Sequence, residues 1–139
     1  MIAAMRIMSR VAVALAVLAL CASAAIAATG NNRVVGGCTK SQTKPSEIIL
    51  ACADGNAAVD HIHWSSFGGP QATGSGIYSY NTCSPSCVAG KVKSYSVKLN
   101  AAQAKPCWDM HDDYRELSLV FAADAPYKTK KFTLYCPTG

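Results

Sequence analysis

Short stretches of the chain alternate between apolar and polar residues, which is the period of a β-strand with one buried face. In the clearest stretch, Tyr95, Val97 and Leu99 share one face while serine and lysine occupy the other. Apolar residues do not recur at the helical period over a useful length, and residues 101–113 have room for one helical turn at most. The pattern therefore predicts a β-rich domain.

The predicted strands are bounded by glycine, proline and asparagine, which favour turns. They cover Ser46–Ala53, Val59–Phe67, Ala72–Tyr80, Lys91–Leu99, Arg115–Phe121 and Lys131–Cys136. Ala123–Pro126 separates the last two, which we expect to form a hairpin. About six or seven short strands in this arrangement predict an all-β fold, a small antiparallel sandwich or barrel.

Gly74 and Gly76 are two residues apart and therefore fall on one face of a predicted strand. Positions without a side chain allow another backbone or an aromatic ring to come unusually close. We expect such an approach at this strand.

The N-terminal residues have the three parts of a secretory signal peptide. Met1–Arg10 carries two arginines and no acid, Val11–Leu20 is apolar, and Ala25–Ala27 ends the segment with small residues. The sequence therefore predicts a cleaved signal over residues 1–28. The alternatives are an uncleaved membrane anchor and a lipoprotein acylated at Cys21. The second half of the segment is mostly alanine, and the residue before the cysteine is not small, which disfavours both.

Removal of the signal changes the composition. The chain is 50% hydrophobic and carries 13 basic and 8 acidic residues. Two of the basic residues, Arg6 and Arg10, leave with the signal, so the remaining net charge is about +3. The lysines are scattered, so we expect no nucleic-acid partner. We also expect no membrane span after processing.

The cysteine count supports the same processing. The chain has seven cysteines, and six remain without Cys21: Cys38, Cys52, Cys83, Cys87, Cys107 and Cys136. An even set in a small exported protein predicts a disulfide framework. We therefore expect a flexible N-terminal tail over residues 29–37, followed by a single disulfide-stapled β-rich domain over 38–139.

The spacing suggests which cysteines pair, although six cysteines allow about 15 arrangements. The favoured set is Cys83–Cys87, Cys52–Cys136 and Cys38–Cys107. The first pair closes a short loop around Pro85. Each cysteine of the second continues the apolar face of a predicted strand, and the third pair is what remains.

Four segments together carry a resemblance to a known family: Pro45–Asn56 with its Cys-Ala-Asp-Gly-Asn motif, Trp64–Gly68, Ala72–Gly76, and Asn81–Gly90 with its Cys-x-Pro-x-Cys motif. They resemble a family of small secreted actinobacterial proteins that are uncharacterised. The resemblance spans Pro45–Leu99 and departs from the family at Phe67, usually tryptophan, and at Ser96, often proline. It implies export and this architecture, and it implies no catalytic residue.

Histidines are the strongest candidates for chemistry. His61 and His63 lie about 7 Å apart on one predicted strand face, and His111 precedes two aspartates, so together they could bind a metal. A partly exposed strand face explains them as well, because no known zinc spacing is present. We assign no metal site and no cofactor.

The same strand bears on the enzyme hypothesis. Val59 is expected to share the histidine face, with Ile62 and Trp64 opposite. Asp60 and His61 would then point to opposite faces and form no dyad. The sequence lacks a G-x-S-x-G nucleophile motif, and the turn-forming residues around Cys83-x-x-x-Cys87 favour a structural disulfide over a redox centre. We assign no catalytic residue.

Aromatic residues offer a candidate contact surface. Trp64 and Tyr95 are expected to fill the core, whereas Trp108 lies in a loop beside Cys107 and is the better candidate for exposure.

These observations favour a secreted or envelope-associated, non-enzymatic module that binds a protein or cell-envelope ligand. One alternative is a small hydrolase or metal-dependent enzyme that uses the three histidines. Another is an inhibitor-like protein that presents Asn81–Gly90 to a protease as a rigid extended loop.

Overall fold

The computed structural model describes residues 32, 34–36, 38, 40–108 and 111–136. The predicted signal peptide over residues 1–28 lies outside them. The strands are β1 (Val34–Gly36), β2 (Lys40–Gln42), β3 (Ile48–Ile49), β4 (Ala57–Ser66), β5 (Gln71–Asn81), β6 (Val92–Pro106), β7 (Asp112–Phe121) and β8 (Thr129–Thr133). The described part of the chain contains no helix.

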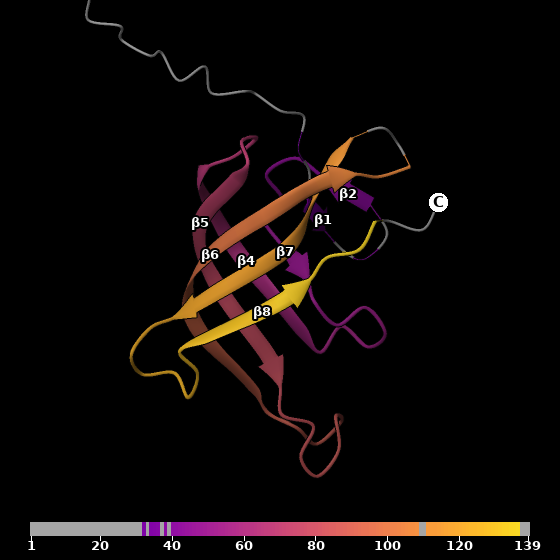
Figure 1. The fold of residues 1–139 in the computed structure, drawn as a ribbon. Helices are drawn as coiled ribbons and strands as arrows, with labels where there is room; N and C mark the ends of the chain where they lie inside the picture. The colour runs from indigo at the N-terminus through magenta and orange to yellow at the C-terminus, as the bar shows by residue number, and fades with distance from the viewer. Residues whose placement is uncertain (1–31, 33, 37, 39, 109–110, 137–139) are drawn as a thin grey trace, which may run out of the picture.

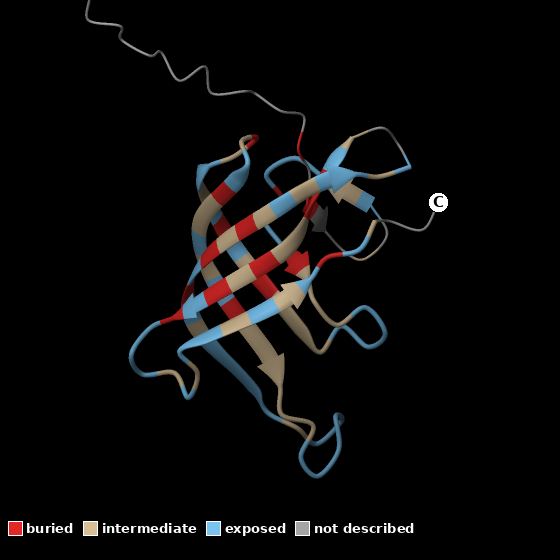
Figure 2. Cartoon of the chain, in the orientation of Figure 1, coloured by how far each residue is buried: buried red, intermediate tan, exposed pale blue. Residues whose placement is uncertain are grey.

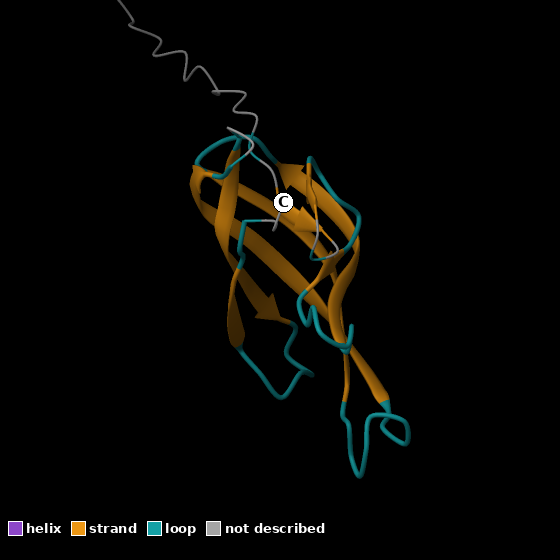
Figure 3. Ribbon diagram, turned by 90° about the vertical axis from the view of Figure 1, so that its right-hand side faces the viewer, coloured by secondary structure: helices purple, strands orange, loops and turns teal. Residues whose placement is uncertain are grey.

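The strands β3 to β8 form one antiparallel sheet in which each strand pairs with the next along the chain. This sheet curls into a half-barrel (Figures 1 and 3). β1 and β2 pair as a separate two-stranded sheet at one end. The predicted all-β, antiparallel class is therefore confirmed.

The core lies on the concave side of the half-barrel. In β6 the buried residues are Val97, Leu99 and Ala101, as the alternation predicts. Facing residues in β7 continue this layer, so buried and exposed bands alternate along the strands (Figure 2). The other buried hydrophobic residues are Val34, Ile48, Val59, Ile62, Ala72, Tyr78, Tyr114, Leu117, Leu119, Phe121 and Leu134.

Several predicted elements have different bounds in the structure. The segment Ser46–Ala53 contributes only the two residues of β3. Residues 101–106, which leave room for one helical turn, continue β6 as a strand to Pro106 and pair with β7 except at Gln103. The last predicted strand is displaced by two residues at its start, since β8 begins at Thr129.

Part of the segment 29–37, for which the sequence predicts an N-terminal tail, lies in a strand. Residues 34–36 form β1, which pairs with β2, and Val34 is fully buried. Asn32 is also buried and donates a hydrogen bond from Nδ2 to the carbonyl of Gly69 at 2.6 Å. The segment is polar overall, but its Val34 side chain is part of the core.

The two glycines of β5 allow β4 to approach closely. A Cβ on Gly74 would lie 2.6 Å from the carbonyl oxygen of His63, and one on Gly76 would lie 2.9 Å from that of Asp60. The register of β4 against β5 shifts between Asp60 and His63, and His61 there has a φ of 50°. The close partner is therefore the bulged backbone of β4.

The described residues contain no helix that is long and apolar enough to cross a bilayer.

Candidate functional site

Three disulfides brace the half-barrel: Cys38–Cys52, Cys83–Cys87 and Cys107–Cys136. The pairing of Cys83 with Cys87 agrees with the sequence prediction. The predicted pairs Cys52–Cys136 and Cys38–Cys107 are wrong.

The physical reason is the topology of the sheet. β3 and β8 are the two outer strands of an open half-barrel, and Cys52 lies in a turn beyond the end of β3. Cys52 is instead next to Cys38, whose Sγ also contacts the carbonyl of Ile49. The segment that follows β8 returns to β7, where the amide of Leu134 donates to the carbonyl of Arg115 at 2.8 Å. This pairing carries Cys136 to Cys107.

An open hollow of about 620 Å³ lies beside the Cys107–Cys136 disulfide. Trp108 and Tyr135, each adjacent in sequence to one of these cysteines, line it with their side chains 79% and 70% exposed. The full lining is Pro106, Cys107, Trp108, Arg115, Tyr135 and Cys136. The predicted exposure of Trp108 is thus present, and a second exposed aromatic residue accompanies it.

Arg115 supplies the positive charge of the hollow. It lies on β7, where its Nε donates to the carbonyl of Leu134 at 2.9 Å, and its Nη1 lies 3.0 Å from Sγ of Cys136. These contacts hold the guanidinium in one orientation. No acid in the described part of the chain forms an ion pair with it.

The arrangement is a binding site in chemical terms. Exposed Trp and Tyr rings offer flat apolar surfaces with polar edges, and a fixed guanidinium is a fork of donors suited to a carboxylate. Sequence reasoning missed Arg115 and Tyr135. The sequence does hold one signal, because each of these two cysteines has an aromatic neighbour, Trp108 after Cys107 and Tyr135 before Cys136. That signal is informative only once the two cysteines are known to pair.

The structure does not bring the three histidines together. His61 and His63 lie exposed on β4, and through the paired strands His63 is level with Val120 on β7. His111 precedes Val120 by about nine residues, or roughly 30 Å of extended chain. In the part of the chain that the structure describes, no group of three potential metal ligands is close enough to hold an ion.

The β4 bulge also corrects the predicted faces of that strand. Val59 and Ile62 are both buried, whereas the sequence places them on opposite faces. Asp60 and His61 were expected to point apart, but Oδ1 of Asp60 lies 2.9 Å from Nδ1 of His61. The positive φ of His61 turns its side chain back toward its neighbour. Both groups lie on the surface, where such a pair contributes little to stability.

Trp64 and Tyr95 pack against the core as half-buried residues, as the sequence predicts. Nε1 of Trp64 donates to the carbonyl of Pro45 at 2.9 Å, and its ring meets that of Phe67 edge to face. Phe67 in turn contacts Tyr114, whose hydroxyl donates to the carbonyl of Gly69 at 2.8 Å. These aromatics fix the fold rather than form a surface.

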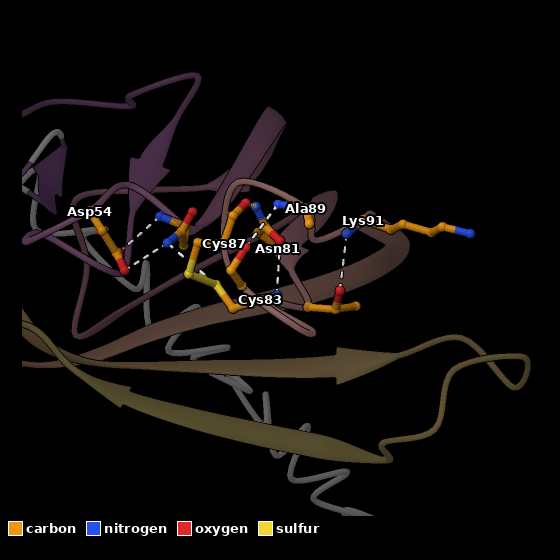
Figure 4. The surroundings of a disulfide bond; sticks show 9 residues. Asp54, Asn81, Cys83, Cys87, Ala89 and Lys91 are labelled. Carbon is orange, nitrogen blue, oxygen red and sulfur yellow. Dashed lines mark hydrogen bonds between the residues drawn. A yellow bond between two sulfur atoms is a disulfide. The ribbon is translucent and has the colours of Figure 1, made fainter.

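A second candidate is the loop between β5 and β6, which is fixed by side-chain contacts around its disulfide (Figure 4). Asn81 accepts a hydrogen bond from the amide of Cys83 at 2.9 Å and donates one to the carbonyl of Cys87 at 2.8 Å. Nearby, the backbone amide of Asn56, and then its side chain, donate to the carboxylate of Asp54 and lower the Asp54 pKa. Nδ2 of Asn56 also lies 3.6 Å from Sγ of Cys83, which ties the loop to the adjacent turn.

The loop presents a bent surface. Residues 84–89 are all exposed, Val88 fully so, and residues 87–89 form a turn. The inhibitor alternative required an extended segment here, because a protease reads its substrates in extended form. The inhibitor alternative stays a prediction.

Comparison of the chain with protein-family models, with curated proteins and with solved structures finds no match. The function of the protein is therefore inferred from its own geometry.

Proposed function

We propose that this protein is an exported, non-enzymatic module that binds a carboxylate-bearing glycan of the cell envelope. The single observation that carries the proposal is the hollow formed by Trp108, Tyr135 and Arg115. The apolar faces of sugar rings stack on exposed aromatic rings, and a held guanidinium pairs with a carboxylate on the same chain.

The framework favours binding because the site is already ordered. The Cys107–Cys136 disulfide joins the segments that carry Trp108 and Tyr135, and Arg115 is hydrogen-bonded in place. A preorganised site loses little conformational entropy when its ligand binds.

Export is part of this proposal. Its support is the signal-like pattern of residues 1–28 together with three disulfides, which persist in oxidising compartments. Membership of the secreted actinobacterial family remains a prediction on the motifs quoted above.

The test is calorimetric titration with soluble oligomers of alternating N-acetylglucosamine and N-acetylmuramic acid. Chitin oligomers of the same length, which lack the carboxylate, serve as the matched ligand. We expect the carboxylated oligomer to bind at least about tenfold more tightly, since one charge-assisted contact is worth on the order of 1.4 kcal/mol or more.

The variants Trp108→Ala and Tyr135→Ala should each weaken binding by about tenfold or more, as central aromatic contacts usually do. Val88→Ala, an exposed apolar residue of the other loop, is the control and should bind as the parent does. Equal affinity for both oligomers, or full affinity in both aromatic variants, would rule out this site.

A further inference from the structure

A lysine on β8 points toward the inside of the half-barrel. Lys130 pairs with Leu119, which is fully buried, and residues directly opposite in an antiparallel pair share a face. Burial along β8 alternates accordingly, with Lys130 and Phe132 half-buried between exposed neighbours. A charged residue at such a position is uncommon and has either a structural or a functional cause.

Three tyrosine rings surround the ammonium group of Lys130. Its Nζ lies 3.9 Å from the ring centroid of Tyr127, 5.4 Å from that of Tyr78 and 5.7 Å from that of Tyr80. Tyr78 and Tyr80 come from β5 and stack at 5.7 Å, whereas Tyr127 comes from the loop before β8. The cation–π contacts hold the charge at this end of the sheet.

No carboxylate of the described residues forms an ion pair with Lys130. Among the described residues, the ion pairs are those of Asp60 with His61 and of Glu116 with Lys131, and neither involves Lys130. Lys93 adds a second positive charge, because it lies opposite Tyr80 in the register of β5 and β6 and is likewise without an ion pair in this part of the chain.

Hydroxyl groups complete the site. The phenols of Tyr127 and Tyr80 form a hydrogen bond at 3.4 Å, and both residues are half-buried. The hydrogen bond with Tyr80 is the largest cause of the lowered pKa of the Tyr127 phenol, and the charges of Lys130 and Lys93 lower it further. Two ammonium groups and two hydroxyls thus gather where three elements meet.

We propose that Lys130, Lys93, Tyr80 and Tyr127 bind a phosphate group at the end of the half-barrel opposite the β6 terminus that leads to Trp108. Lysine ammonium groups act as point charges toward phosphate, and phenol hydroxyls add directional hydrogen bonds to its oxygens. The phosphate can come from a lipid headgroup or a soluble phosphate ester, because the recognised chemistry is the same.

A structural explanation competes with this one. An inward-pointing charge on an outer strand also prevents edge-to-edge association of sheets, and β8 is an outer strand. That explanation predicts aggregation or dimerisation when the charge is removed and no effect on phosphate binding.

The experiment measures binding of sn-glycerol 3-phosphate and inorganic phosphate by NMR titration of backbone amides, in about 150 mM salt to screen diffuse attraction. We expect shifts at β8, the end of β5 and the start of β6. The substitutions Lys130→Met and Lys93→Met should each lower the affinity at least about fivefold, which is about 1 kcal/mol. Lys98→Met, an exposed lysine elsewhere on β6, is the matched control and should change it less than twofold.

The source of the phosphate is read from two further arms. Sedimentation with phosphatidylglycerol vesicles, compared with phosphatidylcholine vesicles, tests a lipid headgroup, and the glycerol phosphate titration tests a soluble ester. Binding in either arm that Lys93→Met weakens supports the site, and this exposed variant keeps the test valid even where Lys130→Met alters folding. Absence of binding in both arms, equal loss in Lys98→Met, or association of Lys130→Met with full phosphate affinity overturns it.

Discussion

At the scale of single residues, Gly90 shows how a polar loop is fixed by the lack of a side chain. A Cβ at this position would lie 2.0 Å from Oδ1 of Asn81 and 2.7 Å from the amide nitrogen of Cys83. Asn81 is the residue that bridges both ends of the disulfide loop, so it cannot move aside without losing its hydrogen bonds. The side chain of Asn81 and the backbone of Cys83 thus both depend on this glycine.

We therefore predict that Gly90→Ala destabilises the protein by about 1–3 kcal/mol through overpacking. Thermal unfolding should show a lower midpoint, and hydrogen exchange should speed up at residues 83–90. Gly69→Ala is the control, since a Cβ there would meet nothing nearer than 3.7 Å. An unchanged midpoint in Gly90→Ala would mean that Asn81 has an alternative conformation of equal stability.

At the scale of elements, strand patterns were predictable and their interruptions were not. Alternation placed Val97 and Leu99 in the core because β6 runs without a register shift against β5. The same rule failed in β4, where the bulge at His61 puts Val59 and Ile62 on the same side. A bulge depends on the partner strand, here on two glycines of β5, and the alternation of β4 alone does not contain it.

The disulfides also differ as elements, because they close loops of unequal length. Cys83–Cys87 spans 4 residues of sequence separation and Cys107–Cys136 spans 29. A longer loop restricts the unfolded chain more, by about 2 kcal/mol for this difference in the chain-entropy description.

We predict that Cys107→Ser with Cys136→Ser lowers the free energy of unfolding by about 2 kcal/mol more than Cys83→Ser with Cys87→Ser. Denaturant unfolding of both double variants measures this difference. The first pair should also abolish glycan binding, because it frees the segments carrying Trp108 and Tyr135, whereas the second should leave binding intact. The reverse ranking would show that native contacts of the short loop outweigh chain entropy.

At the scale of the whole molecule, the sequence predicted the class of fold and one of the two aromatic residues of the hollow. The curl of the sheet decided the rest. It leaves β3 and β8 unpaired with each other, and Cys52 and Cys136 line a common cavity there but bond to Cys38 and Cys107 instead. It also gathers Tyr80, Lys93 and Lys130 from three distant segments at one end. Such groupings follow from long-range strand order, which residue periodicity does not encode.

The tyrosines at that end make the free energy of unfolding depend on pH in the alkaline range. The hydrogen bond with Tyr127, followed by burial, raises the pKa of Tyr80 to about 12, whereas the same hydrogen bond lowers the pKa of Tyr127. A phenol with a raised pKa contributes stability below its unfolded pKa of about 10 and loses it as the pH approaches the folded value. The contribution of Tyr127 to stability depends on pH in the opposite sense. It increases as the pH rises to about 10 and is then constant.

Between about pH 10 and 12 the change in stability from this pair therefore comes from Tyr80 alone, and its sign is a loss. We predict that Tyr80→Phe makes the free energy of unfolding fall less steeply over this interval than in the parent protein. Absorbance titration at 295 nm should correspondingly lose a late-ionising phenol in Tyr80→Phe and an early-ionising one in Tyr127→Phe. Tyr135→Phe, at the other site, controls for the removal of one hydroxyl. Parallel pH profiles in parent and Tyr80→Phe would show that the two phenols do not interact in solution. This result would contradict the hydroxyl pair proposed for the phosphate site.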